Sequence, residues 1–226
     1  VERAKEYSPP LTLGGRGSRP GLGCHMCDVF VRRNTNRSQM QEMEAWPRII
    51  ARAQETGVTE AAMGANASFG SNFLGDFSVD MYMKLLEKQH ELWDDAGIKV
   101  TGASVGDPMS WCHPVKVEEI FYRVKERWPE IVNFKAHLHN SRGMAISSMY
   151  AAIKSLGPED PLNIDGTIGG FGGCPYCGNG RATGLAATED VMHMMDGMGI
   201  ESGVDLDKLI DCVWKAEKIL GRQLWG

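Results

Sequence analysis

The chain has 226 residues, enough for one domain with a sizeable core and too few for two comfortable ones. A net charge of −5, with no cluster of Lys and Arg, argues against a nucleic-acid-binding surface. No apolar run approaches the roughly 20 residues of a membrane span, and the N-terminus shows no secretory signal. We therefore expect one domain over residues 1–226 that binds neither nucleic acid nor membrane.

Cysteine usage points to the cytoplasm. The six cysteines lie at positions 24, 27, 112, 174, 177 and 212. In a chain of this size, scattered cysteines favour reduced thiols over a disulfide framework. The two Cys-x-x-Cys pairs, Cys24/Cys27 and Cys174/Cys177, leave a zinc or redox site as an alternative. Zinc ribbons usually hold their pairs ~15–20 residues apart, far closer than these two pairs, so we do not favour that alternative.

Residues 1–37 are predicted to be irregular. Pro9-Pro10 and Gly14-Gly15 are typical of loops, and apolar periodicity is lacking. The one exception is a short strand candidate at residues 28–31.

From residue 38 onward, amphipathic helices alternate with short apolar runs typical of buried strands. Ser78 is an expected N-cap, and Gly97 is an expected helix stop. Helices are predicted at 39–55, 79–95, 115–128, 141–156, 188–198 and 205–220, and strands at 58–65, 98–105, 131–138 and 162–168. This α/β order predicts a parallel sheet, with a TIM (β/α) barrel favoured over an open doubly wound sheet.

Two histidines follow one of the predicted strands. In a strand, residues i and i+2 point to the same face, so His137 and His139 should face one side together. At the carboxyl end of a barrel strand that side is the active-site mouth. Two imidazoles there form half of a site for a divalent metal, although an isolated His-x-His pattern more often has no such role.

A glycine-rich segment, Gly-Gly-Phe-Gly-Gly-Cys174-Pro-Tyr, follows the next predicted strand. So many glycines lose much backbone entropy on folding, which makes a packing role unfavourable. They are consistent with a loop that carries a thiol over a pocket. Cys174 is therefore a candidate for proton transfer or nucleophilic attack.

These motifs together resemble 3-hydroxy-3-methylglutaryl-CoA lyase. The resemblance rests on the His-x-His pair, the Gly-Gly-Cys-Pro-Tyr loop, Ala-Thr-Glu-Asp190 and the Gly-Asp107 turn, in that family's order. It implies that His137 and His139 bind a divalent cation, Mg²⁺ or Mn²⁺ rather than Zn²⁺. It also implies that Cys174 is an acid/base on a mobile loop and that Asp107 acts at the mouth.

The resemblance also has implications for Glu2, Leu185 and Asn179. Glu2, before Ser8-Pro9, is similar to the family's active-site glutamate. The family's Asn ligand falls on Leu185 here, and Asn179 is the candidate to replace it. The partner implied is an acyl-CoA substrate, and we expect a homodimer.

The barrel is predicted to be incomplete. No strand with the family's Arg-Asp pair precedes Glu2, and one internal βα unit is not evident. A TIM barrel has about 250 residues, so we expect a truncated or incompletely represented chain rather than a divergent one.

The expected reaction is retro-aldol, Claisen-type cleavage of a carboxylated 3-hydroxyacyl-CoA to acetyl-CoA and an oxo-acid, the work of a carbon–carbon lyase. A condensing enzyme of the same superfamily and a catalytically impaired homologue remain as alternatives.

Overall fold

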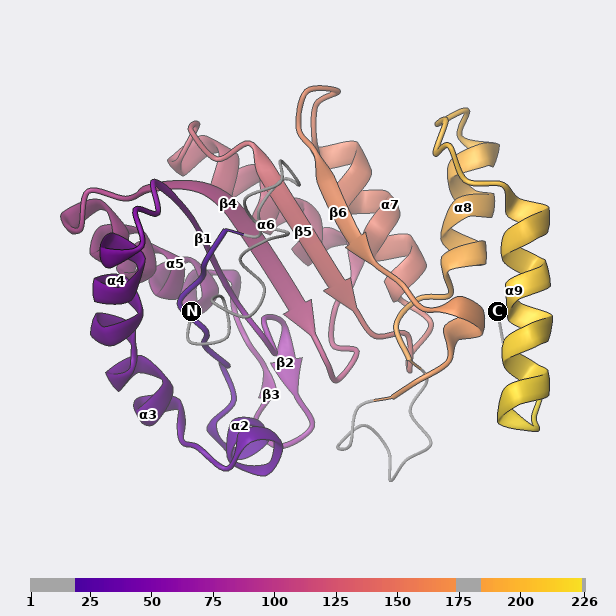
Figure 1. Cartoon of the computed structure of the whole chain (residues 1–226), viewed down its shortest axis with the longest axis horizontal. Helices are drawn as coiled ribbons and strands as arrows, with labels where there is room; N and C mark the ends of the chain where they lie inside the picture. The colour runs from indigo at the N-terminus through magenta and orange to yellow at the C-terminus, as the bar shows by residue number, and fades with distance from the viewer. Residues whose placement is uncertain (1–18, 174–183, 225–226) are drawn as a thin grey trace.

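The computed structural model describes residues 19–173 and 184–224, which form an α/β fold built on one parallel sheet (Figure 1). Its four strands follow the chain in the order β1-β4-β5-β6. They are β1 (Glu60–Ala65), β4 (Lys99–Asp107), β5 (Asn133–Leu138) and β6 (Leu162–Asp165). A two-stranded antiparallel sheet, β2 (Gly70–Ser71) with β3 (Gly75–Asp76), follows β1.

The helices alternate with these strands, as the sequence predicts. They are α2 (Asp28–Thr35), α3 (Gln39–Glu44), α4 (Trp46–Glu55), α5 (Val79–Asp95), α6 (Pro114–Arg127), α7 (Ala145–Ser155), α8 (Thr188–Gly197) and α9 (Leu206–Leu220), with a 3-10 turn, η2 (Ile168–Gly170).

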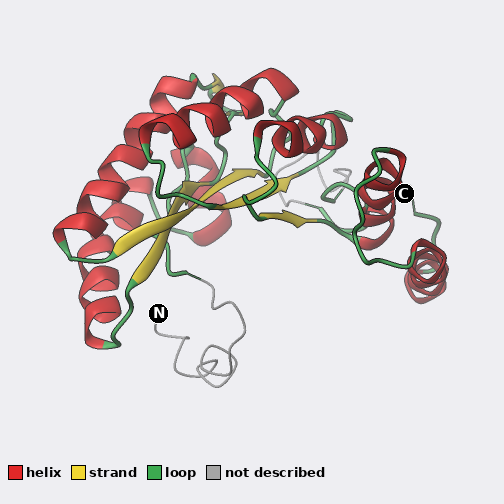
Figure 2. Cartoon of the chain, turned by 90° about the horizontal axis from the view of Figure 1, so that it is seen from above, coloured by secondary structure: helices red, strands yellow, loops and turns green. Residues whose placement is uncertain are grey.

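The sheet is curved, and the helices α4 to α7 lie on its outer, convex face (Figure 2). A doubly wound sheet reverses its strand order and carries helices on both faces. Sequential strand order with helices on one face is the winding of a (β/α) barrel. The barrel is not closed in the part of the chain that the structure describes, which agrees with the incomplete barrel expected from the sequence.

Short extended segments continue the sheet at both edges. Residues 20–26 run parallel to β1, where the amide of Asn66 donates to the carbonyl of Cys24 at 2.9 Å. At the other edge, the amide of Ala186 donates to the carbonyl of Leu138 at 3.3 Å, and Thr167 bridges to Ala187. Residues 184–187 thus lie at the carboxyl ends of β5 and β6.

The strand candidate at residues 28–31 is wrong, because this segment begins helix α2. Cys27 is its N-cap, and its sulfur accepts a hydrogen bond from the amide of Phe30 at 3.4 Å. Asp28 pairs with Arg32 one turn later, and Asn36 ends the helix in the left-handed conformation. These local contacts favour the helix over an extended conformation. Residues 1–18 of the segment predicted to be irregular lie outside the described residues.

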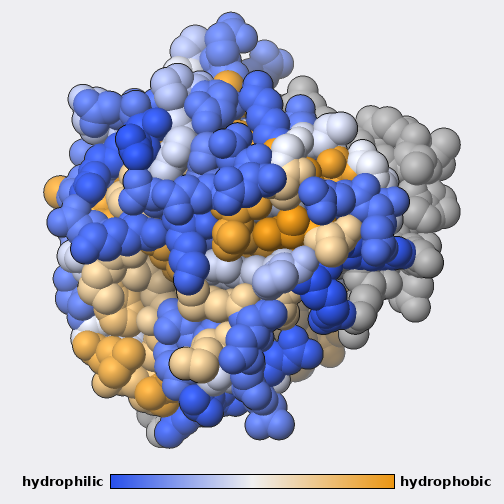
Figure 3. Space-filling view, turned by 90° about the vertical axis from the view of Figure 1, so that its left-hand side faces the viewer, coloured by the Kyte–Doolittle hydropathy of each residue, from blue (hydrophilic) through white to orange (hydrophobic). Residues whose placement is uncertain are grey.

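The predicted helix at 39–55 is divided into α3 and α4. Pro47 sits in the first turn of α4, where its missing N–H costs nothing, but it cannot continue a helix that started earlier. Trp46 beside it is buried, so the break lets α4 turn a new face to the core. Figure 3 shows the side of the molecule that carries α3 and α4, where hydrophilic side chains cover much of the face around smaller apolar areas.

The helix α5 begins after Ser78, whose hydroxyl accepts from the amide of Met81 at 3.3 Å, and Gly97 follows it with a φ of +71°. Both signals were predicted. Met81 on this helix is 50% exposed, whereas Tyr82 and Leu86 face the core.

The core face of α6 follows helical spacing: its buried residues are Val117, Ile120, Phe121 and Val124. The helix α7 starts at Ala145 rather than at 141, because Gly143 at φ +71° forms a turn first. None of the helices in the described ranges is long and apolar enough to cross a membrane.

Candidate functional site

A cavity of about 870 Å³ lies on the inner, concave face of the sheet. The strands β1 and β4 line it with small residues such as Gly64, Gly102 and Gly106. The strands β5 and β6 contribute polar side chains, among them His137 and Asp165. The small residues of β1 and β4 leave space for a ligand, and the polar side chains of β5 and β6 can bind it.

His137 and His139 lie at the carboxyl end of β5, and their ring centroids are 5.4 Å apart. His139 is 8% exposed, and the His137 side chain is 37% exposed toward the cavity. Alternation along the strand places the two rings on one face, as predicted, while Ala136 and Leu138 between and beside them face the helices and are buried.

Asp165, at the end of β6, fixes the orientation of His137. Its carboxylate lies 2.8 Å from Nδ1 of His137 and 2.9 Å from Nζ of Lys135. Burial alone would raise the pKa of Asp165, but hydrogen bonds from His137 and Lys135 outweigh it and hold the pKa below its ordinary value. With Nδ1–H donating to Asp165, Nε2 of His137 keeps its lone pair for a ligand.

Asp165 was not among the predicted site residues. It is the register partner of His137 on the neighbouring strand. The sequence alone does not supply that register.

Asp107 is fully buried at the end of β4 and does not line the cavity. Its carboxylate accepts hydrogen bonds from the amides of Trp111, at 2.9 Å, and Cys112, at 2.6 Å. Burial raises the pKa of Asp107 despite these hydrogen bonds. Through these hydrogen bonds the carboxylate holds the loop that follows β4. The catalytic role expected for Asp107 stays a prediction.

Three of the predicted site residues, Glu2, Cys174 and Asn179, lie outside the described residues. Leu185 lies inside them: it is buried and bridges to His139 in antiparallel fashion. The position that corresponds to the family's Asn ligand is therefore next to His139, but its side chain has no oxygen.

Cys24 and Cys27 are separate, buried free thiols. Burial, with the nearby charge of Glu42, raises the pKa of Cys24 to about 12. Cys24 is therefore a thiol rather than a thiolate at neutral pH, which disfavours a redox role. Cys177, in the second pair, lies in the range that the structure does not describe.

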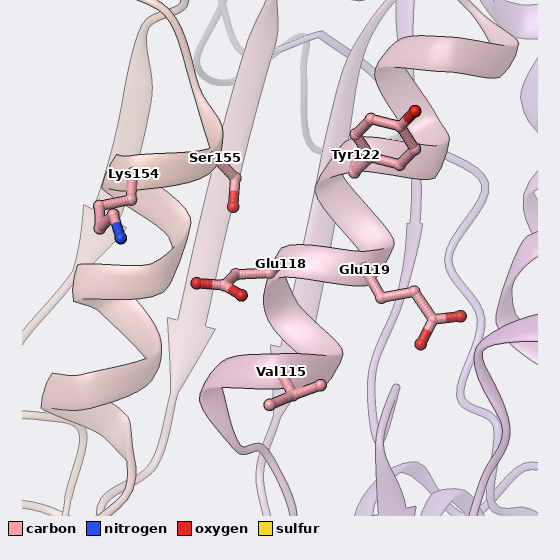
Figure 4. A pocket seen from close by; sticks show the side chains of 6 residues that line it. All are labelled: Val115, Glu118, Glu119, Tyr122, Lys154 and Ser155. Carbon is pink, nitrogen blue, oxygen red and sulfur yellow. The ribbon is translucent and has the colours of Figure 1, made fainter.

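A second hollow of about 590 Å³ lies between α6 and α7 (Figure 4). It is lined by Val115, Glu118, Glu119, Tyr122, Lys154 and Ser155. It belongs to the outer helical layer, on the opposite side of the sheet from His137, and neither histidine nor cysteine lines it. The inner-face cavity is therefore the candidate site.

The donor set at the histidines fits a divalent cation in part. Two imidazole nitrogens on one face, one of them backed by a carboxylate, form a frequent half-site. Among residues 19–173 and 184–224, no group of three or more His, Cys, Asp or Glu side chains converges as a metal cluster. Within these two ranges, any further ligands would be oxygen atoms of another kind, such as amides, or would come from water or substrate.

Comparison with known proteins places this geometry in context. The HMGL-like family model matches residues 22–213. A hydroxymethylglutaryl-CoA lyase of Bacillus subtilis is 28% identical over 197 residues, which is 87% of this chain and 61% of that protein. An (R)-citramalyl-CoA lyase of Chloroflexus aurantiacus is also 28% identical, over 87% of this chain and 58% of that protein.

Solved structures of HMG-CoA lyases have a similar fold. An HMG-CoA lyase of Acinetobacter baumannii, in complex with coenzyme A and 3-methylmalate, superposes with a TM-score of 0.73 at 25% identity, over 91% of this chain and 63% of that one. The Bacillus subtilis HMG-CoA lyase gives 0.72 at 26% identity, over 91% and 64%. This chain spans about 60% of the length of the relatives it matches.

Proposed function

We propose that this chain, which belongs to the HMGL-like family, carries the metal-binding part of a carbon–carbon lyase that acts on a carboxylated 3-hydroxyacyl-CoA. The observation that carries the proposal is the pair His137 and His139 at the carboxyl end of β5, with Asp165 holding the first ring. The named activities of the matched relatives, and the coenzyme A in one matched structure, support the choice of substrate class.

The reaction is a retro-aldol, Claisen-type cleavage. The carbon–carbon bond between the hydroxyl-bearing carbon and the α-carbon of the thioester breaks. A base takes up the proton of the hydroxyl group, whose carbon becomes the ketone of an oxo-acid, and the enolate left on the thioester takes up a proton to give acetyl-CoA. A divalent cation, Mg²⁺ or Mn²⁺, supplies Lewis acidity that lowers the pKa of the substrate hydroxyl.

The residues of this chain divide the remaining work. His137 and His139 would hold the cation, and Asp165 keeps the Nε2 atom of His137 directed away from β6. Cys174 is proposed as the proton donor to the enolate. Its role and that of Glu2 rest on the sequence resemblance.

The direct test is to incubate the chain with Mg²⁺ and either HMG-CoA or (R)-citramalyl-CoA and to follow acetyl-CoA by mass spectrometry. We expect cleavage of at least one of the two. Because both lyases are 28% identical to this chain, the ratio of the two rates chooses the acyl group.

Three variants sharpen the assay. His137→Ala should remove most activity together with most bound metal, while Asn163→Ala, which changes an amide elsewhere in the same cavity, should leave metal binding unchanged. Cys174→Ser should reduce turnover about 10²- to 10⁴-fold with metal binding intact. Metal binding without cleavage of either substrate would favour a condensing enzyme or an impaired homologue. The homodimer and the cytoplasmic location remain expectations from the sequence.

A further inference from the structure

A further histidine lies beside the cavity. His25 lies in the extended segment that runs beside β1 and is 9% exposed. Its Nδ1 lies 2.9 Å and 3.1 Å from the two carboxylate oxygens of Glu42, and its backbone amide donates to the same carboxylate at 3.0 Å. With Nδ1–H donating to Glu42, Nε2 of His25 becomes a hydrogen-bond acceptor.

Asn66 is the partner of that acceptor. It is an exposed residue directly after β1, and its Nδ2 lies 3.4 Å from Nε2 of His25. An amide group that donates through its nitrogen to His25 must turn its oxygen the other way. Glu42, through His25, thus determines which end of the Asn66 amide faces the cavity.

The oxygen of Asn66 lies over β4 at a glycine. A Cβ added to Gly106 would meet Oδ1 of Asn66 at 2.2 Å, so the absence of a side chain there makes room for this amide. Gly106 in turn is the register partner of His137 on β5. Neighbouring strands are about 4.8 Å apart. Asn66 Oδ1, Gly106 and His137 therefore form one row across the inner face of the sheet.

We propose that Asn66 supplies an amide oxygen to the cation held by His137 and His139, and that His25 and Glu42 fix that amide in its binding orientation. Mg²⁺ and Mn²⁺ prefer oxygen ligands, and a neutral amide oxygen is a common one. Leu185, next to His139, offers none. The inference rests on the cation of the proposed function, and Asn66 deepens that site by adding a ligand.

The experiment is a titration of the purified chain with Mn²⁺, followed by electron paramagnetic resonance, which detects the free ion and needs no substrate. Asn66→Ala should weaken binding by about tenfold or more. Asn66→Asp keeps an oxygen at the same place and should retain the wild-type affinity or improve on it. Asn163→Ala, the control amide in the same cavity, should bind as wild type.

The positioning role has its own test. His25→Ala should weaken Mn²⁺ binding less than Asn66→Ala does. The double variant should bind Mn²⁺ no more weakly than Asn66→Ala alone, because His25 acts only through the Asn66 oxygen. If His25→Ala does not fold, Gly106→Ala replaces it, since the new Cβ displaces the Asn66 oxygen directly.

The outcomes separate this inference from the proposed function. Wild-type affinity in Asn66→Ala, with loss of binding in His137→Ala, overturns the role of Asn66 and leaves the histidine site standing. Equal losses in Asn66→Ala and Asn66→Asp also overturn it, because the oxygen then does not matter. Unchanged binding in both His137→Ala and His139→Ala removes the cation from this face and overturns both proposals.

Discussion

At the scale of single residues, the contact between Asp165 and His137 links the site to protein stability. Partial burial acts to raise the pKa of Asp165 above its ordinary value of 3.8, but the hydrogen bonds from His137 and Lys135 lower it below that value. A carboxylate with a depressed folded-state pKa stabilises the fold above its unfolded pKa, and this contribution is lost as the pH falls through the folded value.

We therefore predict that Asp165→Asn lowers the melting temperature at neutral pH and that the difference from wild type shrinks once the pH falls below 3.8. Thermal unfolding of both proteins by circular dichroism, at steps from about pH 7 to about pH 2.5, measures this across the range in which the charge is lost. A difference that is the same at every pH would show that the carboxylate charge plays no part.

Asp107 is the second residue whose role its contacts define. Its carboxylate accepts from two backbone amides in the loop after β4. An asparagine side chain at this position would have only one oxygen, and its NH₂ group would face one of those N–H groups. Asp107→Asn should therefore cost about 1–3 kcal/mol of unfolding free energy, the cost of an unsatisfied buried donor.

Urea unfolding measures that loss, with exposed Asp95→Asn as the control. If Asp107→Asn were as stable as wild type but lacked turnover, the carboxylate would act on substrate, as the family resemblance implies.

At the scale of elements, α3 shows how a helix start presents a functional carboxylate. Ser38 Oγ accepts from the amide of Gln41 at 3.1 Å, and the Gln41 side chain accepts from the Ser38 amide at 2.8 Å, which is a capping box. Glu42, the next residue, is the partner of His25. The cap thus holds the turn that orients Glu42.

Ser38→Ala should destabilise the fold by about 1 kcal/mol and should also weaken Mn²⁺ binding. Ser78→Ala removes the N-cap of α5, at a similar cost in stability, and should leave the metal affinity unchanged. Urea unfolding and the Mn²⁺ titration, run on both variants, compare the two effects. Equal metal affinities in Ser38→Ala and Ser78→Ala would contradict the link from α3 to the site.

At the scale of the whole molecule, the described sheet is an open arc whose inner face lines the cavity. Parallel sheets normally have both faces covered. Here the helices cover the outer face, and the inner face of β1 and β4 carries small side chains rather than large apolar ones. A cation bound there would add stability that the open arc itself does not provide.

We predict that the protein melts at a higher temperature with Mn²⁺ than with EDTA. A ligand present at about 100 times its Kd stabilises a folded protein by about 2.7 kcal/mol. Differential scanning fluorimetry with and without the metal measures the shift, and His137→Ala should abolish it. The same shift in His137→Ala would place the bound ion elsewhere.

The sequence by itself determined the features that depend on neighbouring residues. The Ser78 cap, the Gly97 stop and the buried face of α6 arise from contacts within a few positions, so periodicity and residue type suffice to predict them. His137 and His139 share a face because side chains alternate along any strand. The family motifs added the expected metal and reaction.

Tertiary structure alone decided which distant residues meet. Asp165 reaches His137 because β6 pairs with β5 in one register, and a shift by one residue would turn that carboxylate to the other face. Asn66 lies in the row of His137 because Gly106 stands between them on β4. Such contacts depend on strand order and register, which are set by long-range packing of the whole sheet. No local pattern in the chain encodes them.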